Sequence, residues 1–140
     1  MRVLGIDYGE KRIGIAVSDE TGMVARPLTT ILHTRLDRDC AVIRRLVEEL
    51  GVERIVVGYP ITLGGKESIQ CSYVARFIEV LTSKIGVPVV RWDESMSTKR
   101  AEEILIESDM GRKRRKKVVD RLAAAIILQE YLERTADTQS

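Results

Sequence analysis

The sequence predicts an α/β fold in which helices cover both faces of one mixed five-stranded sheet. Two short apolar segments near the N-terminus are separated by a brief turn and indicate an antiparallel hairpin. After residue 35 the hydrophobic period changes from that of strands to that of helices. Two further apolar segments then alternate with helical ones, which is typical of parallel strands. The 140 residues suit one domain over 1–140.

The strands are expected in order along the chain. The first covers 2–7 and the second 12–18, with a turn at 8–11 between them. A third strand at 26–32, which contains Pro27, completes an antiparallel meander. The segment 54–58 is β-branched, as in strands buried on both faces, and 87–91 forms the fifth strand. The sheet therefore combines a three-strand antiparallel meander with two parallel strands.

The helices occupy the segments between and after these strands. Apolar residues recur at helical spacing over 36–50, and Gly51 ends that helix. Further helices are expected at 66–85, 97–108 and 118–133, while 59–65 and the basic segment before residue 118 are expected to be loops. Ligands on such sheets bind at the carboxyl ends of the strands. That rule directs attention to acidic residues at strand ends.

Composition narrows the function classes. No apolar run approaches the ~20 residues of a membrane helix, and the N-terminus lacks the apolar stretch of a signal peptide. We therefore expect a cytoplasmic protein without a membrane partner. Cys40 and Cys71 form no C-x-x-C pair, so two reduced thiols within helices are expected rather than a zinc site. His33, the single histidine, is expected to be a surface residue of a loop, which leaves carboxylate chemistry as the more open route.

Asp7 ends an apolar strand, although aspartate is depleted in strands. Alternation places it on the same face as Val3 and Gly5. It could simply bond the backbone of the following turn. The functional interpretation is a carboxylate held at the strand's carboxyl end, with Gly5 and Gly9 leaving room for a ligand.

Asp120 begins the last expected helix. An acid in the first turn suits the helix dipole, which is the simpler explanation. However, Ala123, Ala124 and Ile127 follow it at helical spacing, so its face is small and apolar. Asp120 should therefore point toward the sheet, where its charge needs a counter-charge such as a divalent cation.

Asp93 and Glu94 follow the fifth expected strand, and spacing alone does not choose between them. They could also be two solvated acids of a loop. If one of them converges with Asp7 and Asp120, every ligand is a carboxylate oxygen. Such a set suits Mg²⁺ or Mn²⁺, which cleave phosphodiesters when paired.

Charge is distributed unevenly, although the net charge is only +2. Six cations are consecutive, and such a block favours a mobile loop or contact with an anion. The block stands immediately before Asp120, where it could hold a polyanion backbone against the expected metal site. Its residues are Arg112, Lys113, Arg114, Arg115, Lys116 and Lys117.

Six stretches of the chain resemble the pre-16S rRNA nuclease family, also called Holliday-junction-resolvase-like, in the correct order over essentially the whole chain. They are GIDYG at 5–9, RIGIAV at 12–17, ARPL at 25–28, IVVGYP at 55–60, DESMST at 93–98, and VD at 119–120 with AAIILQ at 124–129. The resemblance implies an RNase H-like fold. It also implies a catalytic and metal-binding triad of Asp7, Glu94 and Asp120, and so selects Glu94 over Asp93.

The same resemblance implies an activity and partners. It implies trimming of the 5′ end of the 16S rRNA precursor, with contacts to ribosomal particles, or resolvase-like cutting of branched DNA as the alternative. A monomer or weak homodimer is expected. Arg12 and Lys116 or Lys117 are expected to neutralise the phosphate. The loop after Pro60 departs from the family pattern of Asn followed by Asp-Gly, but Thr62 can still hydrogen-bond nucleic acid.

Two other function classes compete with the nuclease. Actin-like and sugar-kinase ATPases also carry an Asp-x-Gly turn between their first two strands. They need a second similar domain, which 140 residues do not supply, and no second Asp-x-Gly hairpin is present. A non-catalytic RNA- or protein-binding module could use the same sheet. Stabilisation by Mn²⁺ that depends on Asp7 would favour the nuclease.

Overall fold

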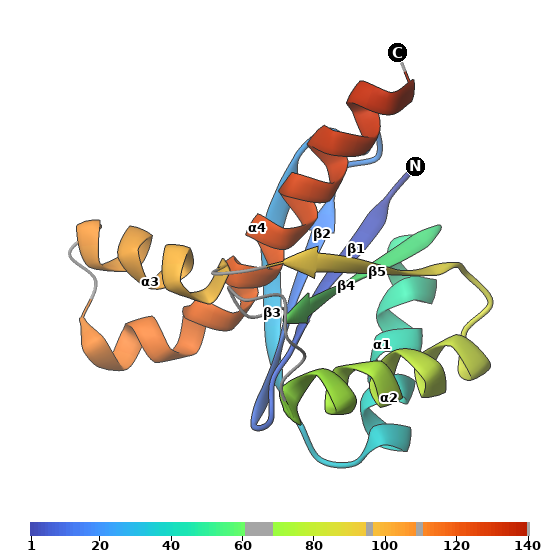
Figure 1. Ribbon diagram of the computed structural model, residues 1–140, viewed down its shortest axis with the longest axis horizontal. Helices are drawn as coiled ribbons and strands as arrows, with labels where there is room; N and C mark the ends of the chain where they lie inside the picture. The colour runs from blue at the N-terminus through green and yellow to red at the C-terminus, as the bar shows by residue number, and fades with distance from the viewer. Residues whose placement is uncertain (61–68, 95–96, 109–110, 140) are drawn as a thin grey trace.

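The computed structural model describes residues 1–60, 69–94, 97–108 and 111–139. It contains five strands and four helices in these residues, arranged around one sheet (Figure 1). The strands are β1 Val3–Tyr8, β2 Arg12–Ser18, β3 Ala25–Leu32, β4 Arg54–Pro60 and β5 Val89–Glu94. The helices are α1 Leu36–Leu50, α2 Ile69–Lys84, α3 Ser97–Glu107 and α4 Arg112–Gln139.

The sheet has the predicted mixed topology, with strand order β3-β2-β1-β4-β5. The first three strands form the antiparallel meander, and β4 and β5 run parallel to β1. A register shift between Ile15 and Ala16 accommodates Pro27, which pairs with Ala16. A bulge is one of the few places where a sheet tolerates proline, because its nitrogen donates no hydrogen bond.

Helices cover both faces, as the sequence predicted. On one face α1 and α2 pack over the sheet through Ile43, Phe77 and Leu81, all fully buried. On the other face α4 packs through Ala124, Ile127 and Leu128 (Figure 1). Gly51 ends α1 with a left-handed φ of 66°, which glycine adopts without a steric penalty.

The largest difference from the sequence prediction concerns the basic segment, which is helical and not a loop. Helix α4 begins at Arg112, and the Arg115 N–H already donates to the Gly111 carbonyl at 2.9 Å. Arginine and lysine are good helix formers. The pairing of α3 with α4 through Leu105 and Val119 supplies the packing that holds this segment in a helix. Helix α3 and the first half of α4 project from the sheet as a helical hairpin (Figure 1).

The parallel strands also extend further than predicted. Strand β4 continues to Pro60 and β5 to Glu94, and these two residues are Cα partners in the register. Asp93 and Glu94 therefore lie within a strand and do not follow it. Thr62 falls in the segment 61–68, outside the described residues, so its expected contact to nucleic acid stays a prediction.

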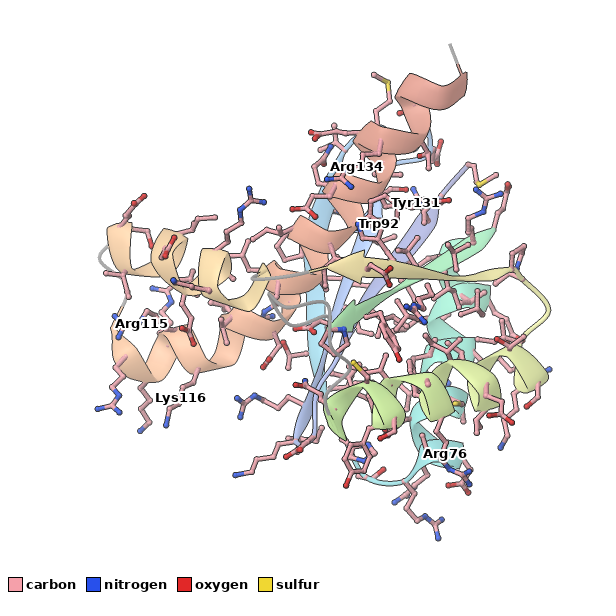
Figure 2. All side chains as sticks on the ribbon, in the orientation of Figure 1. Arg76, Trp92, Arg115, Lys116, Tyr131 and Arg134 are labelled. Atoms are coloured by element: carbon pink, nitrogen blue, oxygen red, sulfur yellow. The ribbon has the colours of Figure 1, made fainter. Side chains whose placement is uncertain are left out.

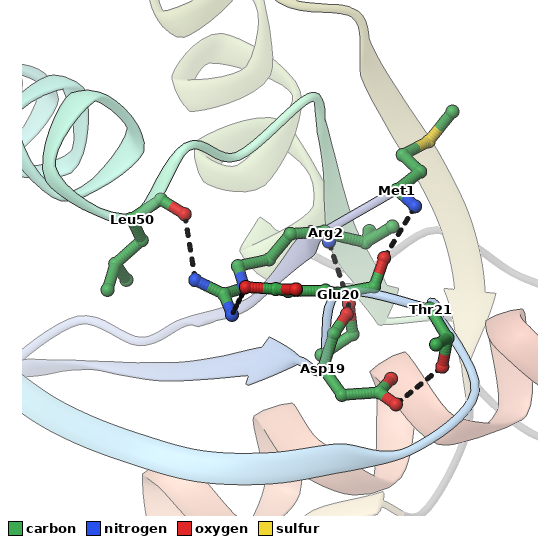
Figure 3. A network of polar contacts seen from close by, with 8 residues as sticks. Met1, Arg2, Asp19, Glu20, Thr21 and Leu50 are labelled. Carbon is green, nitrogen blue, oxygen red and sulfur yellow. Dashed lines mark hydrogen bonds and ion pairs between the residues drawn. The ribbon is translucent and has the colours of Figure 1, made fainter.

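The β2–β3 turn and the start of the chain share a network of polar contacts (Figure 3). The β1–β2 register places this turn at the end of the meander away from Asp7. The Asp19 carboxylate accepts from the Met23 N–H at 2.8 Å and from the Thr21 hydroxyl at 2.5 Å. These hydrogen bonds, the Thr21 hydroxyl first, lower the Asp19 pKa to about 2. The N-terminal ammonium of Met1 donates to the Glu20 carbonyl at 2.7 Å, which ties the start of the chain to this turn.

No helix within the described part of the chain combines the length and the apolar character needed to cross a membrane. Both cysteines are buried free thiols, Cys40 in α1 and Cys71 in α2, as expected. The Cys71 thiol donates to the carbonyl of Pro60 at 2.7 Å and so ties α2 to the end of β4.

Candidate active site

Glycine at position 14 brings helix α4 onto the sheet beside Asp7. A Cβ at Gly14 would lie 1.9 Å from the Asp120 carbonyl oxygen, so the α4 backbone rests directly on β2. Gly14 is the Cα partner of Asp7 across the β1–β2 pair, and directly paired residues of antiparallel strands share a face. Asp7 therefore lies on the α4 face of the sheet, next to the point where Asp120 crosses it.

Asp120 points toward the sheet, as its apolar helix face predicted. Its carboxylate Oδ2 accepts from Arg12 Nε at 2.7 Å, in an ion pair between α4 and the first residue of β2. The Asp120 side chain is 17% exposed and that of Arg12 is 39% exposed. The counter-charge that Asp120 needs is thus supplied by Arg12, which the sequence analysis had assigned to the phosphate.

Gly5 leaves no room for a ligand beside Asp7, contrary to the sequence interpretation, whereas Gly9 lines a cavity. A Cβ on Gly5 would lie 2.8 Å from Cβ of Leu128, so α4 fills that space. At Gly9 a Cβ would lie 2.5 Å from the Arg12 carbonyl oxygen, and the Gly9 N–H donates to the same oxygen at 3.0 Å. Gly9 therefore serves the tight β1–β2 turn.

A cavity of about 410 Å³ opens beside the ion pair. Asp120 and Arg12 border it, together with Lys11 of the β1–β2 turn. Gly9, Glu10 and Gln70 complete the lining. The cavity thus combines two acids able to bind a cation, Asp120 and Glu10, with two basic residues able to bind a phosphate.

The structure places Asp93 away from this cavity. Its carboxylate pairs with Arg91 Nε at 2.9 Å on the same strand, and both side chains are about half exposed. Val90 and Trp92, which alternate with them, pack against the α4 cluster, so Asp93 lies on the opposite face. Figure 2 shows Trp92 beside Tyr131 and Arg134 of α4.

Glu94 ends β5, and its side chain lies outside the described residues. Among the side chains that the structure describes, no three carboxylate, histidine or cysteine groups gather closely enough to hold a metal ion. Two members of the expected triad therefore belong to the described residues: Asp7 of β1 and Asp120 of α4, the helix that packs on that face of the sheet. Membership of Glu94 in the same site stays a prediction.

The basic run lies on the projecting half of α4 (Figure 2). Arg112, Arg115 and Lys116 line a cavity of about 290 Å³ together with Glu102 and Ile106 of α3. Lys113, Arg114 and Lys116 are exposed, while the Lys117 side chain lies outside the described residues. At a rise of about 1.5 Å per residue, the run begins roughly 12 Å along the helix from Asp120.

The structure also reveals a polar network that the sequence analysis missed. Asp39, at the start of α1, is 2% exposed and contacts His33 Nδ1 in a short hydrogen bond. It also accepts from the Thr34 N–H at 3.2 Å, and the Tyr8 hydroxyl lies 3.4 Å from His33 Nδ1. Burial, followed by the charge of Asp39 and the Cys40 thiol, raises the pKa of Tyr8 to about 12.

His33 is consequently not the surface residue that was expected. It does lie in the segment between β3 and α1, but three-quarters of its side chain is covered. One signal could have revealed the network. Asp39 is three residues after Leu36 and four before Ile43, on the apolar face of the predicted helix, where an acid needs a buried partner.

Comparison with known proteins supports a nuclease. The profile of a family described as "RuvX: Holliday junction resolvase" matches residues 1–134. A protein of Syntrophus aciditrophicus named "Putative pre-16S rRNA nuclease" is 52% identical over 133 residues, covering 95% of this chain and 89% of that protein. One of Desulforudis audaxviator with the same name is 43% identical over 94% of both chains.

Solved structures show the same fold. RuvC of T. thermophilus, in complex with a Holliday junction substrate, superposes with a TM-score of 0.61 at 22% identity, covering 99% of this chain and 97% of that one. The fowlpox virus resolvase in complex with Holliday junction DNA gives 0.59 at 14% identity, covering 96% and 99%. The expected RNase H-like fold is thereby confirmed.

Proposed function

Because the chain belongs to the RuvX family of Holliday-junction-resolvase-like proteins, we propose that it is a divalent-metal-dependent nuclease that trims the 5′ end of the 16S rRNA precursor. The family resemblance seen in the sequence is confirmed, and with it the coarser conclusion that this is a nuclease. The metal dependence and the substrate are the proposal. The relatives' shared name supports the rRNA precursor, and branched DNA is the alternative that the family description supports.

The observation that carries the proposal is the crossing of α4 over β2 at Gly14. It brings two carboxylates from opposite ends of the chain, Asp7 and Asp120, to one side of the sheet. Two carboxylates near each other repel unless cations lie between or beside them. In the structure Arg12 pairs with the Asp120 carboxylate, with its Nε 2.7 Å from Oδ2.

The donor set fits Mg²⁺ or Mn²⁺. Asp7 and Asp120 offer hard oxygen ligands, which these ions prefer. Glu94 ends β5 at the carboxyl edge of the sheet, two residues after Trp92, which packs toward α4. We propose Glu94 as the third ligand. When bound, the ions activate a water molecule and stabilise the oxygens of the phosphoryl group.

The chain's own residues would position the substrate. Lys11 and Arg12 border the 410 Å³ cavity and can hold the phosphate to be cut. The Arg12 guanidinium donates to Asp120 in the free enzyme and would donate to a phosphate oxygen in the complex. Positions 113, 116 and 117 precede Asp120 by seven, four and three residues, so they share its side of α4. There they can contact the backbone of the bound strand.

The test is cleavage by the pure protein with Mn²⁺ of a precursor rRNA carrying its 5′ extension and of a four-way DNA junction, side by side. We expect trimming of the RNA and loss of that trimming in Asp7→Asn, whose melting temperature without metal should stay near that of the parent. Asp93→Asn, on the opposite face, is the matched control and should cleave normally. Wild-type-like cleavage by Asp7→Asn would refute the site.

The same preparations separate the alternatives. Preferential cutting of the junction would replace the rRNA assignment with the resolvase one. If neither substrate is cut and Mn²⁺ gives no thermal shift, the chain is a binding module. We further propose that the protein acts in the cytoplasm on ribosomal precursor particles, as a monomer or weak homodimer.

A further inference from the structure

A second cavity adjoins the candidate active site on the other side of the β1–β2 turn. It has a volume of about 280 Å³. Its lining shares Gly9, Glu10 and Gln70 with the 410 Å³ cavity, so the two are neighbours. The residues that it does not share are Tyr8, His33 and Tyr73, which are all ring-bearing.

The inner wall of this cavity is rigidly built. The Tyr8 ring stacks on Phe77 with centroids 4.1 Å apart and an interplanar angle of 13°. The His33 ring meets the Tyr8 ring edge-on at 5.4 Å, and the buried Asp39 carboxylate fixes its Nδ1. These rings are held by core contacts, so a ligand would meet a preformed surface.

Tyr73, at the outer wall, is 55% exposed although it is a large aromatic residue. It lies on α2 one turn after Gln70, whose amide can both donate and accept hydrogen bonds. An exposed aromatic ring beside a preformed ring-lined cavity is the arrangement that proteins use to stack unpaired bases.

The chemistry of the two cavities differs in a way that identifies their ligands. The cavity at Asp120 carries Lys11 and Arg12 and suits a phosphate. The second cavity is lined by no lysine or arginine among the described residues, so it offers no cationic side chain to an anion. Its size lies just below the ~300–1,000 Å³ of small-molecule pockets, which suits a single small planar group.

We propose that the cavity formed by Tyr8, His33, Gln70 and Tyr73 binds the base of an unpaired nucleotide next to the phosphodiester that is cut. The inference rests on the proposed nuclease function and adds a substrate class to it: a strand whose base at this position is unstacked. The Tyr73 ring stacks on the base, while the Gln70 amide and the Glu10 carboxylate can hydrogen-bond its polar edge.

The experiment measures binding without cleavage. Fluorescence anisotropy with Ca²⁺ in place of Mn²⁺ follows a labelled single-stranded RNA that spans the 5′ processing site, and a series of RNAs in which one nucleotide at a time is abasic. We expect Tyr73→Ala to weaken binding of the intact RNA by about 5- to 150-fold, the range found for one stacked base. Tyr73→Phe should bind like the parent. Val42→Ala, which removes an exposed apolar side chain from α1, is the matched control.

The coupling between Tyr73→Ala and the removal of one base from the RNA tests the inference. One abasic position should weaken binding by the parent protein but cause no further loss with Tyr73→Ala, because the variant has already lost that contact. The inference would be overturned if Tyr73→Ala bound the RNA as tightly as the parent. It would also be overturned if, at every abasic position, the fold-loss in affinity from Tyr73→Ala multiplied the fold-loss from the missing base. In either case cleavage by the parent would leave the nuclease function standing, whereas a parent that neither binds nor cuts RNA would end both.

Discussion

Replacing Gly14 with alanine tests the packing that assembles the candidate site. A Cβ at this position would lie 1.9 Å from the Asp120 carbonyl oxygen and 2.2 Å from its carbonyl carbon. Ordinary contact begins near 3.4 Å, so α4 would have to retreat by about 1.5 Å. The obstacle is helix backbone, which cannot rotate away as a side chain would.

Two effects of Gly14→Ala follow from that displacement. Overpacking costs typically about 1–3 kcal/mol, and a clash with backbone belongs at the upper end, so we expect a loss of about 3 kcal/mol. For a chain of this length the melting temperature should fall by roughly 10 °C. Because Asp120 moves with the helix, Mn²⁺-dependent cleavage should fall about 100-fold, as for other misplacements near 1 Å.

Gly86→Ala is the matched control, because a Cβ there meets nothing within 4 Å and the backbone is not left-handed. Denaturant unfolding and single-turnover cleavage of both variants provide the assay. If Gly14→Ala unfolds and cleaves like Gly86→Ala, then α4 does not depend on close contact with β2, and the argument that places Asp120 beside Asp7 fails.

Three further outcomes are expected. Arg12→Ala should lower the free energy of unfolding by about 1 kcal/mol without metal, because it leaves Asp120 unpaired, and Mn²⁺ should raise its melting temperature more than that of the parent. Changing Lys113, Arg114 and Lys116 to glutamine should make the slope of log K against log salt shallower by about 2 for single-stranded RNA, as measured by anisotropy. The parent should lose stability between pH 10 and 12, and Tyr8→Phe should not. Burial, the largest cause, raises the folded-state pKa of Tyr8 from 10.0 to about 12. The contribution of the buried phenol to the free energy of unfolding is therefore complete below pH 10 and is lost as the pH rises through about 12.

Each of these outcomes can fail in a specific way. An Arg12→Ala variant as stable as the parent would show that the ion pair is worth nothing measurable. For the basic run, glutamine at Arg38, Arg44 and Arg45 of α1 is the matched control; an equal change of slope in both triple variants would exclude a specific contact on α4. Unfolding curves of Tyr8→Phe and the parent that fall in parallel above pH 10 would contradict the buried phenol.

The fold could be predicted because its signals are local and consistent with one another. Strand period, turn length and the stop at Gly51 each specify one element, and together they predicted a mixed sheet of an antiparallel meander and two parallel strands. The order of the strands came from the structure. The basic segment was the exception. Charge repulsion favours a loop there, but the contact of α3 with α4 at Val119 adds packing that no local pattern displays.

The sequence indicated the acidic residues of the candidate site but not the residues that surround them. Asp7 and Asp120 each break a local rule, so single positions indicated them as candidates, and their catalytic role stays a prediction. Their proximity depends on Gly14, a glycine inside a strand, which signals a close backbone approach but not what approaches. Arg12 could not be assigned to Asp120 from sequence, because the two are 108 residues apart and meet only when α4 docks.

The ring-lined cavity was hidden for the same reason. Only 4% of the residues are aromatic, and they form no run in the sequence that would indicate RNA stacking. Tyr8, His33 and Tyr73 come from β1, the β3–α1 segment and α2, and only the packing of α2 over the sheet brings them to one cavity. Spacing along the chain contains no sign of that contact.

The most direct test of the central claim is anomalous diffraction from crystals of the protein soaked in Mn²⁺. We expect a manganese peak about 2.1 Å from carboxylate oxygens of both Asp7 and Asp120, with the Arg12 guanidinium moved from its position on Asp120. Ordered manganese elsewhere in the crystal, with none at these two carboxylates and Arg12 still paired with Asp120, would contradict the account.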